Sequence, residues 1–223
     1  MISVSVFGDS ISTFEGFNPN GYSVFYTKEK QFSNGLTSVK DTWWYRVIKH
    51  LNAELCVNDS FSGSRVSGDT FPAANSNERI SALRSGTSIP DIILVYIGYN
   101  DFGYGVDLKN KKIFSDDPMT FEGAYRIMLD RIKKEFPSSR IICGTLCRTK
   151  IANRPMWKFP EKYYGIALEE YNNIIRKVVR RKKCCLADVS SCGQFIETLD
   201  GSHPNFEGHK ILSELWIQSM SNI

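Results

Sequence analysis

The chain has 223 residues, of which 42% are hydrophobic and 23% are charged, and its net charge is +4. These values are ordinary for a soluble globular protein, and a chain of this length buries enough surface to fold without disulfides or metal ions. No apolar stretch approaches the roughly 18 residues that cross a bilayer, so we expect one domain over residues 1–223 and no membrane span.

Short β-branched runs alternate with amphipathic stretches, the pattern of a parallel sheet wrapped by helices. The resulting prediction is a three-layer α/β/α sandwich with about five strands. In chain order, we expect strand Ile2–Phe7, helix Thr42–Leu51, strand Glu54–Asn58, helix Glu78–Arg84, strand Asp91–Ile97, helix Thr120–Phe136, strand Arg140–Thr145, helix Glu161–Arg181, strand Cys184–Val189 and helix Asn205–Met220.

Three connections are longer than such a fold requires: 12–41, 102–119 and 147–160. The first and third are rich in aromatic residues, among them Phe14, Phe25 and Trp157, which argues against disorder. Ligands of open α/β sheets bind beyond the carboxyl ends of the strands, where these connections begin. We therefore interpret them as walls of a substrate pocket; plain packing over the sheet edge is the alternative.

Much of the positive charge lies in one cluster at the end of a predicted helix: Arg176, Lys177, Arg180, Arg181, Lys182 and Lys183. Cations there complement the helix dipole, and no aromatic residues interleave with them. The cluster therefore indicates a solvated helix face and no nucleic-acid partner.

The six cysteines form no Cys-x-x-Cys pair, and several fall in apolar runs, which favours free thiols in a reducing compartment. The first residues, MISVSVFGDS, lack the basic and long apolar regions of a signal peptide. A cytoplasmic location is the expectation, unless a preceding segment has been removed.

Two segments carry a nucleophile and a base. Gly8-Asp9-Ser10-Ile11-Ser12 follows the first strand, where glycine permits a sharp turn and exposes the serine. Asp200-Gly201-Ser202-His203-Pro204-Asn205 precedes the last helix, with Asn205 as its N-cap. The Asp200 carboxylate lies close enough in sequence to bind one ring nitrogen of His203, which leaves the other to accept a proton from serine. Ordinary turn chemistry is the alternative for each segment alone.

Two further segments offer hydrogen-bond donors to an oxyanion. Asn100, in Gly98-Tyr99-Asn100-Asp101, follows the most apolar predicted strand and carries a neutral amide donor. Gly63, in Asn58-Asp59-Ser60-Phe61-Ser62-Gly63, lets a backbone N–H approach a ligand. Parallel topology brings all four segments to one edge of the sheet, which completes the requirements for acyl transfer.

These four segments resemble the conserved blocks of the SGNH hydrolases, also called the GDSL esterase/lipase family, in the same order and over residues 8 to 203. The resemblance implies a flavodoxin-like SGNH hydrolase fold. It implies Ser10 as nucleophile, His203 as base and then acid, Asp200 as the residue that orients His203, and an oxyanion hole of the Ser10 and Gly63 N–H groups with the Asn100 side chain. It also implies no metal and no organic cofactor, and the histidines and cysteines show no ligand spacing.

The expected activity is therefore hydrolysis of small carboxylic esters through an acyl-Ser10 intermediate. The partner is a small ester, either an acetylated carbohydrate or a short acyl ester, with Phe14, Tyr99 and Trp157 as candidate substrate-binding residues. Lysophospholipase or thioesterase activity, acyl transfer and non-catalytic glycan binding remain alternatives. Whether Arg65 or Arg148 contacts substrate or forms a structural salt bridge stays open, as does the oligomeric state.

Overall fold

The centre of the molecule is a parallel sheet of five strands, seen in a computed structural model that describes residues 1–110 and 116–220. The strands are β1 (Ile2–Gly8), β2 (Ala53–Ser60), β3 (Ile92–Tyr96), β4 (Arg140–Gly144) and β8 (Cys185–Ala187), in the order β2-β1-β3-β4-β8. Each lies within two residues of its predicted bounds, so the predicted sheet is confirmed. The strand order reverses between β1 and β3, which is where such sheets bind ligands.

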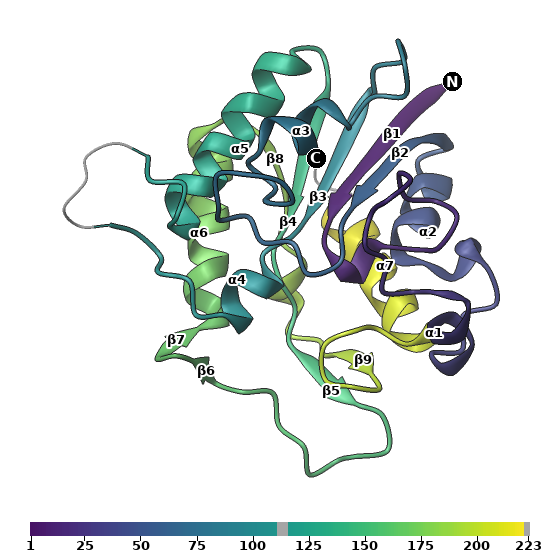
Figure 1. Ribbon diagram of the computed structural model, residues 1–223. Coiled ribbons are helices and arrows are strands. Elements are labelled where there is room, and N and C mark those ends of the chain that lie inside the picture. The colour runs from purple at the N-terminus through teal and green to yellow at the C-terminus, as the bar shows by residue number, and fades with distance from the viewer. Residues whose placement is uncertain (111–115, 221–223) are drawn as a thin grey trace.

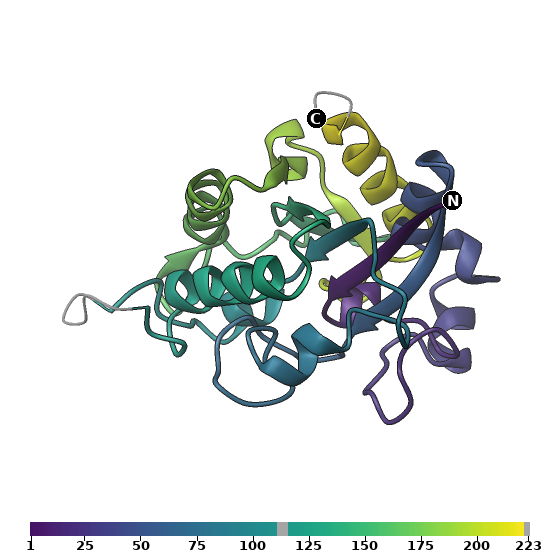
Figure 2. The same ribbon diagram turned by 90° about the horizontal axis from the view of Figure 1, so that it is seen from above.

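Helices cover both faces of this sheet. Helices α2 (Trp43–His50) and α7 (Phe206–Met220) lie on one face, and α3 (Asn77–Ser81), α5 (Phe121–Glu135) and α6 (Leu168–Arg181) lie on the other, as Figures 1 and 2 show. Between α2, α7 and the sheet, the rings of Trp43 and Trp216 stack with their centroids 4.9 Å apart. The predicted three-layer α/β/α fold is confirmed.

The prediction of a helix over Glu161–Arg181 is wrong at its beginning. A short antiparallel hairpin of β6 (Lys162–Tyr163) and β7 (Ile166–Ala167) precedes α6. Its turn places Tyr164 at φ 48° and Gly165 at φ 82°, a left-handed backbone that no α-helix contains. The helix begins only where the Glu170 carboxylate accepts a hydrogen bond from the Ala167 N–H at 2.9 Å, which satisfies a donor at the helix start.

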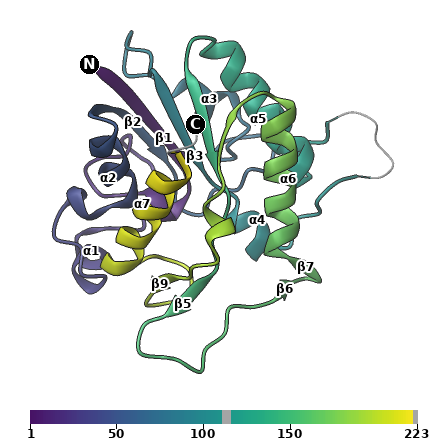
Figure 3. The same ribbon diagram turned by 180° about the vertical axis from the view of Figure 1, so that it is seen from behind.

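Several short elements lie outside the predicted pattern. They include α1 (Lys28–Ser33), α4 (Tyr99–Gly103), the 3-10 helices η1 (Ser10–Ser12), η2 (Val39–Asp41) and η3 (Val189–Cys192), and the parallel pair β5 (Thr149–Ile151) and β9 (Ile196–Thr198). The pair β5–β9 lies beyond the carboxyl ends of the sheet strands, at the bottom of Figures 1 and 3. Part of the long connection 102–119, residues 111–115, lies outside the described residues.

Three of the six basic residues in the cluster at the end of α6 pair with carboxylates of the same chain. Arg176 pairs with Asp188 and Glu169, Lys177 with Glu122, and Lys182 with Asp130. These ion pairs support the interpretation of the cluster as a solvated helix face. All six cysteines are free thiols. Within the described parts of the chain, no helix is both long and apolar enough to cross a membrane.

His209 joins the two helices of one layer. It lies in α7, is completely buried, and its Nδ1 accepts a hydrogen bond of 3.2 Å from the N–H of Trp43, the first residue of α2. That N–H has no partner within its own helix, so the histidine satisfies an otherwise orphaned donor. Burial lowers the pKa of His209 to about 3.

We predict that His209 makes folding sensitive to acid. A histidine pKa below its unfolded value near 6.5 means that the unfolded chain binds more protons, so stability falls as the pH drops from about 6.5 towards about 3. His209→Gln should reduce the difference in unfolding free energy between pH 7 and pH 5 by about 2 kcal/mol, measured by urea denaturation. The exposed His50, changed to Gln, serves as control. An identical pH dependence in His209→Gln and the wild type would refute this role.

Candidate active site

Ser10 lies directly beyond the carboxyl end of β1. Strand β1 ends at Gly8, and Ser10 begins the 3-10 helix η1. A Cβ on Gly8 would lie 2.7 Å from the Ser12 Oγ and 3.0 Å from the Ser60 Oγ, so no larger residue fits there. Gly8 is not among the residues with positive φ. The glycine is therefore required by close approach of neighbouring side chains, and not by the sharp turn that the sequence analysis assumed.

Asp9 fixes the first turn after this strand. Its Oδ1 accepts a hydrogen bond of 3.1 Å from the Ile11 N–H, which caps η1 and orients the turn that carries Ser10. Burial raises the pKa of Asp9 to about 6.

A buried ion pair holds the ends of β1 and β2 together beneath the serine. The Arg79 guanidinium donates to the carbonyl oxygens of Gly8 at 3.0 Å and Asp59 at 2.8 Å, and to the Asp59 carboxylate at 3.2 Å. Both side chains are 0% exposed. Since Gly8 is two positions before Ser10, this guanidinium fixes the backbone from which the candidate nucleophile projects.

His203 and Asp200 complete a hydrogen-bonded chain with Ser10. The His203 Nε2 lies 2.9 Å from the Ser10 Oγ, and the His203 Nδ1 lies 2.7 Å from the Asp200 Oδ2. The other Asp200 oxygen accepts the N–H groups of Ser202 at 2.9 Å and His203 at 2.8 Å. The structure thus brings together the three residues that the sequence analysis predicted.

The charge on Asp200 influences the tautomer of His203. Partial burial favours the neutral form of Asp200, but hydrogen bonds and the charge of His203 outweigh it and lower the Asp200 pKa to about 2. An ionised Asp200 accepts a hydrogen bond from the Nδ1–H of His203 and so favours the tautomer with a free lone pair on Nε2. That lone pair faces the Ser10 hydroxyl, as a general base requires.

Phe25 and Tyr26 hold the histidine segment from the side. The Phe25 ring stacks on the His203 imidazole with a centroid separation of 3.4 Å and an interplanar angle of 8°. The Tyr26 hydroxyl donates to the Pro204 carbonyl at 2.7 Å. The long connection 12–41 therefore orients His203, a role that its aromatic content did not reveal from sequence.

The segments after β2 and β3 are tied to each other. Asn100, in the first turn of α4, donates one Nδ2 hydrogen to the Ser64 carbonyl at 2.8 Å. Asp101 accepts the N–H groups of Val66 at 2.7 Å and Ser67 at 2.9 Å. These bonds fix the loop that begins with the exposed Gly63, whose φ of +82° suits glycine. Burial raises the pKa of Asp101 to about 6, against the lowering effect of these two N–H groups.

A cavity of about 220 Å³ opens beside the Ser10 hydroxyl. Its polar wall contains Ser10, Asn100 and His203, and Gly63 is not among the lining residues. Its aromatic wall is formed by Tyr99, Phe102, Phe159 and Tyr163.

The three predicted substrate-binding residues occupy three different environments. Tyr99 lines the cavity. Phe14 packs into the core, edge-to-face with Phe17 at 5.9 Å, and is not among the residues that line this cavity. Trp157 lines a larger neighbouring cavity instead. The sequence analysis missed Phe102 and Tyr163; the latter was hidden by its assignment to a helix.

Within residues 1–110 and 116–220, no group of three or more His, Cys, Asp or Glu side chains is arranged to hold a metal ion.

Comparisons with known proteins identify the family of this chain. The model of the GDSL-like lipase/acylhydrolase family matches residues 2–190. No curated protein matches the chain. A structure described as a GDSL-like lipase from Bacteroides ovatus is 28% identical, with a TM-score of 0.75 and coverage of 100% of this chain and 99% of that one. A second, from Bacteroides uniformis, is 26% identical, with a TM-score of 0.74 and coverage of 100% and 96%.

A more distant likeness extends to a family 3 carbohydrate esterase from Clostridium thermocellum, which is 16% identical. Its TM-score is 0.61, with coverage of 99% of this chain and 96% of that one, and it shares the fold. The family match spans most of the chain and contains Ser10, the Gly63 loop and Asn100. The resemblance noted from four short motifs is thereby confirmed, and the chain belongs to the GDSL-like lipase/acylhydrolase family.

Proposed function

We propose that this protein is a serine esterase that hydrolyses small carboxylic esters through an acyl-Ser10 intermediate. The observation that carries the proposal is the chain of short contacts from Asp200 through His203 to the Ser10 Oγ, at 2.7 Å and 2.9 Å. Family membership supports hydrolysis of an ester bond. The geometry supports the serine mechanism.

The reaction proceeds in two steps. Ser10 Oγ attacks the ester carbonyl carbon while His203 Nε2 takes the hydroxyl proton, and Asp200 stabilises the imidazolium that forms. The tetrahedral intermediate collapses, His203 returns the proton to the leaving alcohol, and the acyl group stays on Ser10. Water, deprotonated by His203, then attacks the acyl carbon; the bond to Ser10 Oγ breaks, His203 returns the proton to Ser10, and the carboxylic acid is released.

The developing oxyanion has three candidate donors. The backbone N–H groups of Ser10 and Gly63 are two of them, and the Asn100 side-chain amide is the third. An amide nitrogen carries two hydrogens, and the bond to the Ser64 carbonyl uses only one. The second remains for the oxyanion on the cavity side, because Asn100 lines the cavity with Ser10. The Ser64 bond also prevents the amide from rotating away.

The size of the cavity favours a short acyl group. A volume of about 220 Å³ is below the 300–1,000 Å³ or so typical of pockets for drug-sized ligands. This size argues against a long lysophospholipid chain. Thioesters and acyl transfer to another alcohol use the same residues and are distinguished by product analysis.

Deacetylation of a carbohydrate is the favoured form of this activity. Phe159 lines this cavity and also the larger cavity beside it, where it offers, with Trp157, flat apolar surface against which a sugar ring packs. A structural neighbour is named as a carbohydrate esterase, which supports the same direction. Acetate release from acetylated oligosaccharides, compared with p-nitrophenyl esters of increasing chain length, tests this preference.

Removal of the Ser10 hydroxyl should abolish activity. We expect Ser10→Ala to lower kcat on p-nitrophenyl acetate by several orders of magnitude, about 10⁶-fold if it behaves like other serine nucleophiles. A fluorophosphonate probe should label the wild type and not this variant. Ser81→Ala, a change of the same kind at an exposed position, serves as control. Equal rates for wild type and Ser10→Ala would refute the mechanism; absence of labelling would favour a non-catalytic glycan-binding role.

Loss of the Asn100 amide should affect the transition state more than binding. We expect Asn100→Ala to lower kcat by about 100- to 1,000-fold with little change in KM, since the oxyanion forms only during reaction. Asn20→Ala, at an exposed loop position, is the matched control. A rise in KM with unchanged kcat would instead assign Asn100 to ground-state binding.

Phe25 acts as a positioning residue for His203. Aromatic stacking contributes about 0.5–1.5 kcal/mol, so Phe25→Ala should lower kcat by about 2- to 10-fold while KM stays near the wild-type value. Phe25→Tyr keeps a ring in place and should restore activity. If Phe25→Tyr loses as much activity as Phe25→Ala, stacking does not orient the imidazole.

A further inference from the structure

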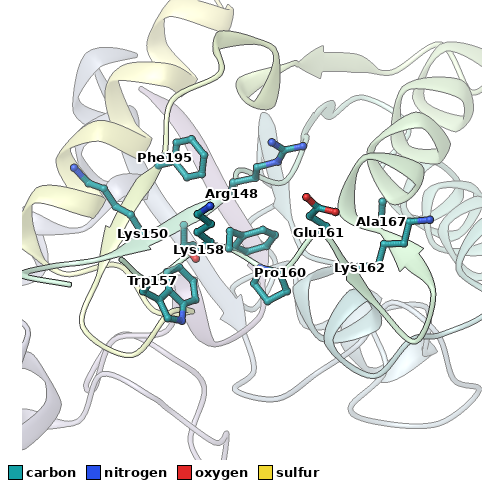
Figure 4. Close-up of a pocket in the computed structure, with 11 residues that line it drawn as sticks. Arg148, Lys150, Trp157, Lys158, Pro160, Glu161, Lys162, Ala167 and Phe195 are labelled. Carbon is teal, nitrogen blue, oxygen red and sulfur yellow. The ribbon is translucent and has the colours of Figure 1, made fainter. Parts of the chain in front are cut away.

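A second, larger cavity adjoins the one at Ser10. Its volume is about 650 Å³, and Phe159 and Pro160 line both cavities, so the two share a wall. The side chains around it come from the beginning of β5, from the segment 157–162 and from Phe195, just before β9 (Figure 4). No step of the reaction described above takes place in this larger cavity.

The cavity is strongly cationic. Four positive side chains line it, namely Arg148, Lys150, Lys158 and Lys162, and Glu161 is the one carboxylate among the described lining residues. Lys150 pairs with Glu197 at 3.4 Å, outside the lining. Glu161 and Glu197 offset two of the four positive charges, so the cavity carries a net charge of two positive units.

Arg148 is the cation best placed to meet a ligand. Its guanidinium extends into the space between Phe195 and Glu161 in Figure 4. The structure contains no ion pair of Arg148, Lys158 or Lys162 with another described residue. This contrasts with the basic residues Arg176, Lys177 and Lys182 of α6, which have carboxylate partners. The alternative of a structural salt bridge for Arg148, left open by the sequence, therefore loses support.

Aromatic rings stand beside these charges. Trp157, Phe159 and Phe195 line the same cavity, and Phe195 is 41% exposed. Flat apolar rings accept the face of a ring-shaped ligand, while a guanidinium binds carboxylate or phosphate oxygens in a bidentate manner. The combination fits a ring that carries an anionic group.

The cationic cavity is linked directly to the loop that carries His203. Strand β5 pairs with β9, and the Arg148 carbonyl accepts the Ile196 N–H at 2.9 Å. The Thr149 hydroxyl donates to the Gly201 carbonyl at 2.6 Å, within the segment Asp200–His203. A molecule that fills the larger cavity therefore contacts the beginning of β5, which is hydrogen-bonded to the loop that carries His203.

We propose that this second cavity binds an anionic group, a carboxylate or a phosphate, on the alcohol portion of the ester whose acyl group occupies the cavity at Ser10. The inference rests on the proposed esterase function and adds a substrate class to it. The small cavity receives the acyl group, and the larger one receives the ring of the alcohol, with Arg148 as the main contact for the anion.

Paired substrates that differ only in the presence of the anionic groups test the proposal. For the carboxylate, acetylated oligogalacturonate is compared with its methyl-esterified form; for the phosphate, acetylated glucose 6-phosphate is compared with acetylated glucose. Acetate release is measured in each case. We expect kcat/KM to be at least about tenfold higher for the charged member of one pair and to fall with added salt. The pair that responds identifies the anion; equal rates within both pairs would overturn the inference.

Matched variants assign the effect to the cavity. Arg148→Gln should remove the preference for the charged substrate, and its rate on neutral p-nitrophenyl acetate should stay unchanged. Arg154→Gln makes the same change of charge in the same connection, outside the cavity lining, and should retain the preference. Loss of preference in both variants would mean that general electrostatic attraction, and not this cavity, selects the anion.

A binding measurement separates failure of this inference from failure of the esterase proposal. Oligogalacturonate and glucose 6-phosphate are titrated into Ser10→Ala and into Ser10→Ala/Arg148→Gln by calorimetry. We expect the added Arg148→Gln change to weaken binding of the responding ligand by about tenfold or more. If the anions bind but the wild type hydrolyses no ester, the esterase proposal is overturned, and the anion is then a ligand and not part of a substrate. Hydrolysis of neutral esters without anion binding would overturn only the anionic site.

Discussion

The buried guanidinium of Arg79 is the interaction on which the position of the candidate nucleophile depends. It donates to the Asp59 carboxylate and to the carbonyl oxygens of Asp59, Gly8 and Pro72, and its charge lies 4.9 Å from the centre of the Phe7 ring. A buried charge is tolerated only when its hydrogen-bonding capacity is met, and here it is met by the ends of β1 and β2. Loss of either partner would leave an uncompensated charge directly beneath Ser10.

The two halves of the candidate site have different structural supports. Ser10 begins η1, directly beyond the end of the inner strand β1, whereas His203 and Asp200 lie between β9 and α7, outside the five-stranded sheet. The histidine is fixed by its neighbours: the Phe25 ring, the Tyr26 hydroxyl bound to Pro204, and the Thr149 hydroxyl bound to Gly201. The precise placement of the base thus depends on loops, while the placement of the nucleophile depends on the core.

The regular part of the fold is readable from sequence because its signals are local. The strands consist of continuous apolar runs, and helices α2, α5 and α7 begin next to Thr42, Thr120 and Asn205, whose side chains accept backbone N–H groups. The start of α6 was predicted too early, although Gly165 marked the break. Strands β5 and β9 have only three residues each, too few for a periodic pattern.

In the candidate site, too, some residues were predictable from sequence and others were not. Ser10, His203, Asp200 and Asn100 follow predicted strands or precede a predicted helix, so parallel topology was enough to bring them together. The stacking of Phe25 on His203 and the core position of Phe14 depend on how the connection 12–41 folds back, which no local pattern encodes. The cationic cavity was likewise out of reach, because β5 and the segment 157–162 meet Phe195 only in three dimensions.

The contact between Ser10 and His203 joins residues 193 positions apart. Contacts of such long range form late, after the intervening elements have found their places. During synthesis, Ser10 leaves the ribosome long before His203 has been made. A domain of this kind completes its folding only once its last elements are available. In the proposed mechanism the reactivity of Ser10 requires His203, so an incompletely folded molecule would carry an inert serine.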